Sequence, residues 1–247
     1  RQMCIRDRYY MNPPAKDLSK IASSDKVKKV QKDFEATHVR PERLMKTLFT
    51  DEAYVKANVD EARLMRRLFD LACNMQSHDT DMQLYSLFTD EECYDLWSCN
   101  NLYWYLTHAC SPVTDGLMPY READLLRNIL DRADAALKEG KNQATLRFGH
   151  ESCLLPLVAL LELNHYGESY PDVEKLSEQW RAYDIFPMAS NVQFVFFHKK
   201  GSNDVLVKVL LNEKEAKLPV KTDVAPYYHW KDVESYYREK LDKYQHI

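Results

Sequence analysis

The sequence predicts an α/β protein in which a mainly helical first half precedes a smaller layer of helices and strands. Apolar residues recur at helical spacing between residues 13 and 110, where strand-like runs are scarce. Later in the chain, two runs rich in β-branched and aromatic residues flank a polar turn, which indicates a β-hairpin. Residues 111–116 have the composition of a linker between these parts. We therefore expect a helical region over residues 9–116 and an α/β region over residues 117–247.

Helices account for the first half of the chain. Good helix formers dominate it, and apolar residues such as Leu64, Leu68 and Leu71 fall on one helical face. The helices are expected over residues 17–34, 41–48, 51–75 and 90–108. The aromatic rings within residues 100–105 are expected to fill a helix core, because aromatic side chains bury a large area.

The second half alternates helices with strands. Pro119 suits the first turn of a helix that runs to about Leu137, and Gly140 is expected to end that helix as a C-cap. The later elements are expected as a strand over residues 144–148, an apolar helix after Gly149 that ends at Leu163, strands over 192–197 and 205–211, and a final helix over 230–244.

Length and charge limit the classes of function. With 247 residues and 45% apolar content, the chain can bury a substantial core. Its formal net charge is −4, from 34 basic and 38 acidic residues, so it lacks the broad positive field that nucleic-acid binding needs. Its apolar runs are far shorter than the roughly 20 residues of a membrane-spanning helix. Residues 1–8 differ in character from the rest of the chain, and we expect them to be a non-native leader.

The residue patterns of common cofactor and metal sites are missing. The five glycines are too scattered for a P-loop or a dinucleotide fingerprint, which need several within a few residues. His150-Glu151 lacks the second imidazole that a zinc-protease pattern places one turn later. The cysteines form no CxxC pair, and buried thiols are expected, with one bridge among Cys93, Cys99 and Cys110 left open for an exported protein. We expect neither a cofactor nor a metal.

The strongest candidate for chemistry is His150-Glu151, where the expected strand gives way to the expected helix. The first N–H groups of a helix have no intrahelical partner, and the macrodipole adds partial positive charge, so an oxyanion is favoured beside His150. Glu151 then places a titratable carboxyl within reach. A structural interpretation stays open, because acidic residues in first turns often serve only to cap helices. The similar His78-Asp79-Thr80 lies in a polar loop and is expected to be surface.

The stretch Leu146-Arg-Phe-Gly-His-Glu-Ser-Cys-Leu-Leu-Pro156 resembles the second signature of the histidine acid phosphatases, the group of phytases and multiple inositol polyphosphate phosphatases. Residues 88–105 are similar to the helical cap of that family, and residues 187–191 and 210–213 to its late core strands. The resemblance implies the C-terminal part of a histidine-phosphatase-type three-layer sandwich, with a mainly helical cap and an incomplete sheet.

The resemblance also implies a reaction through a phosphohistidine. In the family, a histidine within Arg-His-Gly-x-Arg attacks a phosphomonoester, and the acid of the second signature protonates the leaving oxygen. By this resemblance, His150 helps to bind phosphate and Glu151 is the proton donor. The implied substrate is a phosphorylated small molecule, such as an inositol phosphate.

The sequence departs from the family at two points. The family places Asp directly after His, or Glu two residues after it, whereas here Glu151 follows His150 directly. None of the eight histidines is followed by Gly, so the nucleophile motif is absent. We therefore expect the C-terminal half of a longer hydrolase, inactive alone because a general acid without its nucleophile cannot run a covalent mechanism. The resemblance implies that the full-length protein is periplasmic or extracellular.

A second interpretation is a non-catalytic, helical binding module. The 16 Tyr and 4 Trp would then stack on a glycan or dock a protein partner. The two interpretations predict different structures. A phosphatase fragment would place the strand that carries His150 inside a sheet with an unpaired or absent neighbour, which leaves an open apolar edge, whereas a binding module would have a complete sheet and a groove lined by aromatic rings.

Overall fold

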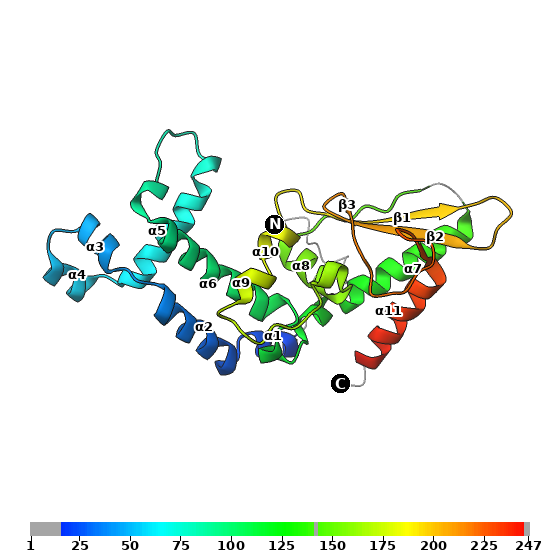
Figure 1. Cartoon of the computed structure of the whole chain (residues 1–247), viewed down its shortest axis with the longest axis horizontal. Coiled ribbons are helices and arrows are strands. Elements are labelled where there is room, and N and C mark those ends of the chain that lie inside the picture. Colours follow the sequence, from blue (N-terminus) through cyan, green and yellow to red (C-terminus); the bar gives the residue numbers. More distant parts are fainter. Residues whose placement is uncertain (1–15, 141–142, 245–247) are drawn as a thin grey trace. The chain divides into compact units, whose positions relative to one another are not determined.

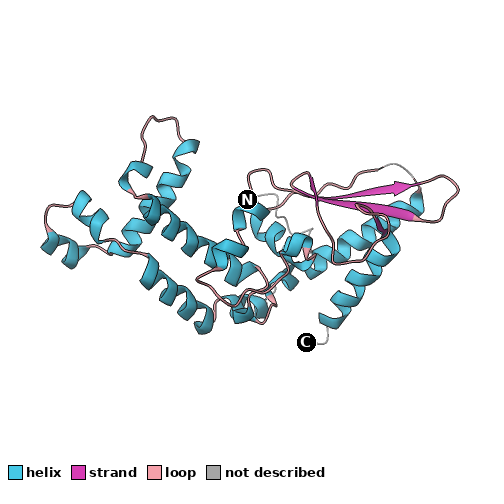
Figure 2. Ribbon diagram, in the orientation of Figure 1, coloured by secondary structure: helices cyan, strands magenta, loops and turns pink. Residues whose placement is uncertain are grey.

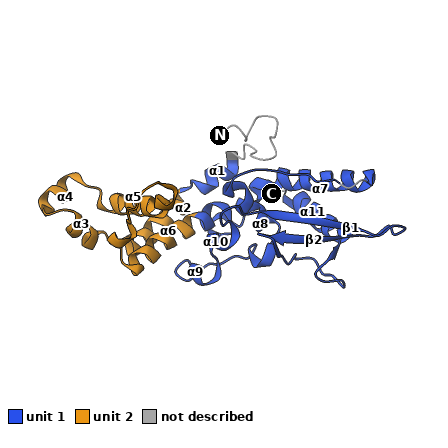
Figure 3. Ribbon diagram, turned by 90° about the horizontal axis from the view of Figure 1, so that it is seen from above, with its two compact units in different colours: residues 1–24, 104–247 blue, residues 25–103 orange. Residues whose placement is uncertain are grey.

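The computed structural model describes residues 16–140 and 143–244, and its elements are labelled in Figure 1. The leader expected at residues 1–8 lies outside the described residues. The described chain is mostly helical with one small antiparallel sheet, which confirms the predicted α/β class (Figure 2). It divides into two compact units, one of residues 25–103 and one that joins the chain before residue 25 to residues 104–247 (Figure 3).

The unit of residues 25–103 has only helices as regular structure. They are α2 (Asp25–His38), α3 (Glu42–Leu48), α4 (Glu52–Asn58), η2 (Met75–Ser77), η3 (Tyr85–Leu87), α5 (Glu61–Asn74) and the larger part of α6 (Asp90–His108). A small core holds them together, in which Leu44 and Met65 are buried with Phe88 and Leu96. The predicted range of α6 is confirmed at both ends.

The single helix expected over residues 51–75 is wrong, because the chain forms two helices there. Helix α4 ends at Asn58, and the Asp60 side chain accepts the Arg63 N–H at 3.0 Å as the N-cap of α5. An aspartate in this position satisfies one of the unpartnered N–H groups of a new helix. The apolar periodicity continues across the break and therefore concealed it.

The helix expected over residues 17–34 is also wrong in extent. The chain forms α1 (Lys16–Ala22) and then α2, with a turn between them. In that turn the Ser23 hydroxyl donates back to the Ser19 carbonyl at 2.8 Å. Short polar side chains compete in this way with the helical backbone, which makes the Ser23-Ser24 pair a weak point of the predicted helix.

The other unit combines helices with the sheet. Its helical elements are α1, the end of α6, η4 (Pro112–Thr114), η5 (Met118–Glu122), α7 (Ala123–Glu139), α8 (Glu151–Leu160), η6 (Leu163–His165), α9 (Leu176–Gln179), α10 (Ala182–Ile185) and α11 (Trp230–Tyr244). Gly140 follows α7 with φ 64°, which confirms the predicted C-cap. The helix expected from Pro119 begins instead with the 3₁₀ turn η5, and the range of α11 is confirmed.

Four strands form the sheet. They are β1 (Val192–His198), β2 (Val205–Leu211), β3 (Lys214–Glu215) and β4 (Tyr228–His229). Strands β1 and β2 pair antiparallel along their whole length, which confirms the predicted hairpin. The short β3 and β4 both pair with β2, so within the described residues one edge of β1 has no neighbour.

One face of the hairpin is covered by helix α11. On this face Val207 and Val209 of β2 are buried. Phe196 of β1 meets the Trp230 ring of α11 edge-on, with 4.9 Å between the ring centroids. Helix α11 contacts both β2 and α7, and the Trp230 indole N–H donates to Asp134 of α7 at 2.9 Å. Helix α11 therefore connects the sheet to α7 in this unit.

The strand expected over residues 144–148 does not form. Residues 143–149 belong to no strand of the sheet, and the apolar side chains of Leu146 and Phe148 are 72% and 65% exposed. An extended segment becomes a strand only when a neighbour completes the hydrogen-bonded ladder. The described residues provide no such neighbour, so this part of the prediction is wrong. The following helix α8 also ends at Leu160 rather than at Leu163.

Candidate functional site

His150 and Glu151 lie together at the start of helix α8, in the unit that contains the sheet. His150 is the N-cap residue, with extended backbone angles (φ −112°, ψ 166°), and its carbonyl accepts the Cys153 and Leu154 N–H groups at 3.0 and 3.1 Å. Its imidazole makes no capping hydrogen bond. Both side chains are exposed, and neither bonds to another described residue. The pair is therefore open to a ligand, while Glu151 also lies in the first turn of α8, where an acid can serve the helix alone.

The rest of α8 is anchored in the core. Residues Leu155 to Leu160 are buried, so only the first turn of this helix reaches the surface. Its C-terminal end is held by α11: the Tyr237 hydroxyl donates to the Leu161 carbonyl at 2.8 Å, and the Lys240 ammonium to the Leu160 carbonyl at 2.7 Å. A cation there also complements the negative end of the helix dipole. The candidate site thus sits at the exposed end of a fixed helix.

The segment that leads into His150 is tied to helix α7 by one arginine. Arg147 Nη2 donates to the Asn128 side-chain oxygen at 2.7 Å. The neighbouring Leu146 and Phe148 remain exposed on either side of it. This contact orients the chain three residues before His150 although no strand pairs with it.

The second His-acid sequence is a surface loop, as predicted. His78, Asp79 and Thr80 are all exposed and follow the 3₁₀ turn η2. The Thr80 hydroxyl accepts the Met82 N–H at 3.2 Å, which is a local turn contact. No apolar helix begins there, so the arrangement at His150 is not repeated.

The five described cysteines are free thiols, and most are partly buried. Burial raises the pKa of Cys99 to about 12 and that of Cys110 to about 11, so both remain protonated at neutral pH. Cys73 is exposed, which corrects the expectation of burial for that residue. Within residues 16–140 and 143–244, no three His, Cys, Asp or Glu side chains are grouped to hold a metal ion.

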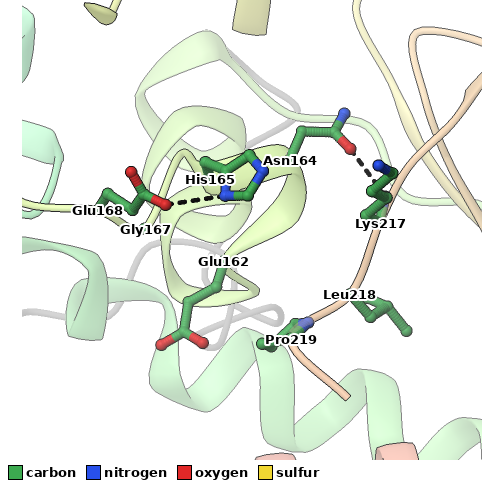
Figure 4. A pocket seen from close by; sticks show the side chains of 8 residues that line it. All are labelled: Glu162, Asn164, His165, Gly167, Glu168, Lys217, Leu218 and Pro219. Atoms are coloured by element: carbon green, nitrogen blue, oxygen red, sulfur yellow. Dashed lines mark hydrogen bonds and ion pairs between the residues drawn. The ribbon is translucent and has the colours of Figure 1, made fainter. Parts of the chain in front are cut away.

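A pocket beyond the C-terminal end of α8 was not expected from the sequence. This cavity of ≈ 210 Å³ is lined by Glu162, Asn164, His165, Gly167, Glu168, Lys217, Leu218 and Pro219 (Figure 4). His165 Nδ1 and Glu168 Oε1 lie 2.8 Å apart, and the Asn164 side chain accepts the Lys217 N–H at 2.8 Å. His165 is thus paired with Glu168, and the Asn164 side chain with the Lys217 backbone. We interpret the pocket as a space within a turn that these contacts hold in place. A run of Asn, His and Gly directly after an apolar helix was the only available signal.

In its fold, the chain is an α/β protein of the phosphatase type. It is similar to the solved multiple inositol polyphosphate phosphatase of Bifidobacterium longum in complex with inositol hexasulfate, with a TM-score of 0.61 and 19% identity, over 94% of this chain and 56% of that one. The phosphate complex of the same protein gives a TM-score of 0.62 and 19% identity, over 95% and 57%. The chain belongs to the histidine phosphatase superfamily (branch 2), whose profile matches residues 4–212.

A human relative is similar over a shorter stretch. Multiple inositol polyphosphate phosphatase 1 of Homo sapiens is 28% identical over 134 residues, which cover 49% of this chain and 27% of the relative. The chain thus spans little more than half the length of the solved structures and matches about a quarter of the human protein. None of the helices among the described residues has both the length and the apolar character that crossing a membrane requires.

Proposed function

We propose that this chain is the C-terminal part of a phosphomonoester hydrolase that acts on inositol polyphosphates or similar phosphorylated small molecules. The observation that carries the proposal is the exposed pair His150 and Glu151 at the first turn of α8. Membership of the superfamily and the similarity to two inositol polyphosphate phosphatases support the reaction class. In this proposal the cap is formed by residues 9–116 and the catalytic layer by residues 117–247.

His150 binds the phosphate, and Glu151 gives a proton to the leaving oxygen. The N–H groups of Glu151 and Ser152 open helix α8, where unpartnered donors and the helix dipole favour an anion. A proton donor must be neutral before it acts, so Glu151 has to carry its proton when the substrate is bound.

The nucleophile comes from a part of the protein outside this sequence. No histidine here is followed by Gly, whereas the family's attacking histidine lies in Arg-His-Gly-x-Arg. Residues 143–149 lack a partner strand and expose Leu146 and Phe148, and β1 has a free edge within the described residues. A strand that carries the nucleophile would cover these surfaces and place the histidine beside His150. The chain alone would not turn over, and the full protein would be periplasmic or extracellular.

The test is carried out on the longer gene product with inositol hexakisphosphate as substrate. Glu151→Gln is expected to lower kcat by roughly 10²–10⁴-fold, the usual contribution of a general acid. Glu151→Asp restores a carboxyl in the family's own position after His and is expected to retain most of the turnover. Glu139→Gln, at the exposed end of α7, is the matched control.

Two results would remove the assignment. Unchanged turnover in Glu151→Gln would exclude Glu151 as the proton donor, provided that the variant folds like the parent. Phosphate release by the present chain without any added segment would show that its nucleophile is not the family's histidine. A labelled phosphohistidine trapped on the longer protein would support the covalent step.

The binding module has weaker support. Tyr105 is fully buried, and its ring meets that of Trp180 at 5.2 Å between centroids, so these two rings belong to the core. Tyr103 and Tyr94 are exposed, but among the described residues no pocket is lined by them. The Tyr105 hydroxyl accepts the Tyr170 N–H at 2.7 Å, which fixes the ring in the core. The strand that the phosphatase interpretation expects before His150 does not form, and only the exposed apolar side chains of Leu146 and Phe148 agree with that interpretation.

A further inference from the structure

His229 lies between two carboxylates that belong to different loops. Its Nδ1 is 3.0 Å from Asp204 Oδ2, and its Nε2 is 3.0 Å from Asp223 Oδ1. Asp204 precedes β2 at the end of the hairpin turn, while Asp223 lies in the loop that leads to β4. His229 itself is the last residue of β4 and pairs with Leu206 of β2. We call this arrangement the Asp204–His229–Asp223 clasp.

Only one charge state of histidine satisfies both contacts. A neutral imidazole has one N–H group and one bare nitrogen, and a bare nitrogen repels a carboxylate at hydrogen-bond distance. The imidazolium donates from both nitrogens, so it can hold Asp204 and Asp223 together. The geometry of the clasp therefore selects protonated His229.

We propose that the Asp204–His229–Asp223 clasp is a pH-sensitive latch that holds the loop of residues 219–227 against the hairpin. When His229 loses its proton, it keeps one carboxylate and releases the other. Both carboxylate oxygens of Asp204 lie near Nδ1 of His229, at 3.0 and 3.1 Å, whereas only one oxygen of Asp223 lies near Nε2. The Asp204 side chain is also less exposed than that of Asp223. Asp223 is therefore the partner released, and the loop that carries it opens.

The charges around the clasp agree with this assignment. The hydrogen bonds from Asp204 and then Asp223 raise the pKa of His229, and the bond to His229 lowers the pKa of Asp223. Lys208 is two residues along β2 from Leu206, and its ammonium is engaged by Glu215 at 3.3 Å. Lys231 and Asp232, at the start of α11, are exposed. The two aspartates are thus the charged groups that bind His229 directly.

The sign of the effect follows from these shifts. A histidine with a raised pKa contributes stability that is complete below its ordinary pKa of about 6.5 and is lost as pH rises through the raised value. An aspartate with a lowered pKa contributes stability that is lost as pH falls through that lowered value. The latch is therefore closed at mildly acid pH and opens on the alkaline side.

NMR of the whole chain tests the latch. The imidazole nitrogens of His229 are expected to titrate with a pKa above about 6.5, and Asp204→Asn or Asp223→Asn should each lower it. Above that pKa, the amides of Val224 and Tyr227, which bond within the loop, should exchange several-fold faster after correction for the intrinsic effect of pH. Glu215→Gln, which alters a carboxylate on the same sheet outside the clasp, is the control.

Two results would contradict the pH-sensitive latch, and two variants test its origin. A pKa of His229 at or below about 6.5 would overturn the proposal, as would loop exchange that stays constant through the titration. His229→Gln should make loop exchange independent of pH in this range, and persisting pH dependence would assign it to another group. If that variant does not fold, Asp223→Ala at the exposed end of the clasp keeps the test intact, because it removes every hydrogen-bonding group from that position and is expected to open the loop at every pH.

Discussion

Arg147 and Asn128 connect the segment before the candidate site to helix α7, with Nη2 donating to Oδ1 at 2.7 Å. The contact spans 19 residues of sequence and lies three residues before His150. Residues 143–149 are not part of a sheet, so no ladder of backbone hydrogen bonds orients them. The side-chain bond from Arg147 to Asn128 orients this segment in part. The position of His150 therefore depends on a helix that does not itself enter the site.

Removing the acceptor should weaken this connection. Asn128→Ala is expected to cost about 1 kcal/mol in the free energy of unfolding, the typical net contribution of one hydrogen bond. In the longer enzyme it should also lower kcat/KM, since His150 would be less well oriented. Denaturant unfolding and steady-state kinetics measure the two effects.

Asn128→Asp is the matched variant, because it keeps an acceptor at the same place and adds charge opposite Arg147. It should be at least as stable as the parent near neutral pH. If both variants behave alike in unfolding and in kinetics, the contact does not orient the segment.

A second prediction concerns the bond that fixes the far end of α8. Tyr237 is fully buried and its hydroxyl donates to the Leu161 carbonyl at 2.8 Å. Tyr237→Phe leaves that carbonyl without its donor and is expected to cost about 1–3 kcal/mol in the free energy of unfolding. Tyr54→Phe, at an exposed tyrosine of α4, should cost almost nothing. Equal losses in the two variants would contradict the role given to Tyr237.

The elements that could be predicted from sequence are those whose signal is local. The hairpin and helices α6 and α11 follow from periodicity and a turn, and the pair at the start of α8 was found from residue types alone. The strand over residues 144–148 has the right composition, yet pairing depends on a neighbour that composition cannot reveal. Asp60 is a residue type that favours an N-cap, so the start of α5 could have been predicted. The continuous apolar periodicity across residues 51–75 favoured a single helix instead.

The contacts missed were those made by polar residues far apart in sequence. Glu162 accepts the Tyr236 hydroxyl and the Lys240 ammonium, each at 2.6 Å, from helix α11 near the C-terminal end of the chain. His229 meets Asp204 across 25 residues. Such pairs produce no periodic pattern in the sequence. They can be identified only from the folded structure, in which α11 and β4 lie beside the rest of the unit.

A third prediction concerns the close approach of Gly167 to Glu162. A Cβ atom built at Gly167 would lie 2.4 Å from the Cγ and 2.9 Å from the Cβ of Glu162. Glu162 cannot move freely, because Tyr236 and Lys240 hold its carboxylate. Gly167→Ala is therefore expected to cost about 1–3 kcal/mol in the free energy of unfolding, the usual penalty of overpacking.

A double-mutant cycle isolates the clash. Glu162→Gly removes both clashing atoms and suits the left-handed backbone of that residue, whose φ is 54°. In this background, Gly167→Ala should lose most of its cost, so the double variant should be destabilised by less than the sum of the two single variants. An unchanged cost would mean that Gly167 is needed for its backbone and not for space.

The last prediction concerns a buried carboxyl in η5. Glu122 is 3% exposed, and its Oε2 has no hydrogen-bond partner among the described residues. Burial raises its pKa to about 8. Between pH 4.5 and 8 the unfolded chain releases this proton while the native chain keeps it, so the free energy of unfolding falls as pH rises, by up to about 4 kcal/mol.

Replacing Glu122 by glutamine tests this directly, because the amide copies the shape of the neutral acid and cannot ionise. Glu122→Gln should lose the downward slope and be more stable than the parent at pH 8, with little gain at pH 4.5. Burial also lowers the pKa of His108 to about 4, which makes stability fall toward acid pH and must be fitted alongside. Glu139→Gln, at the exposed end of α7, should leave the slope unchanged. A parent slope that survives in Glu122→Gln belongs to other titrating groups, such as His229 above about pH 6.5, because the substituted side chain has no proton to release.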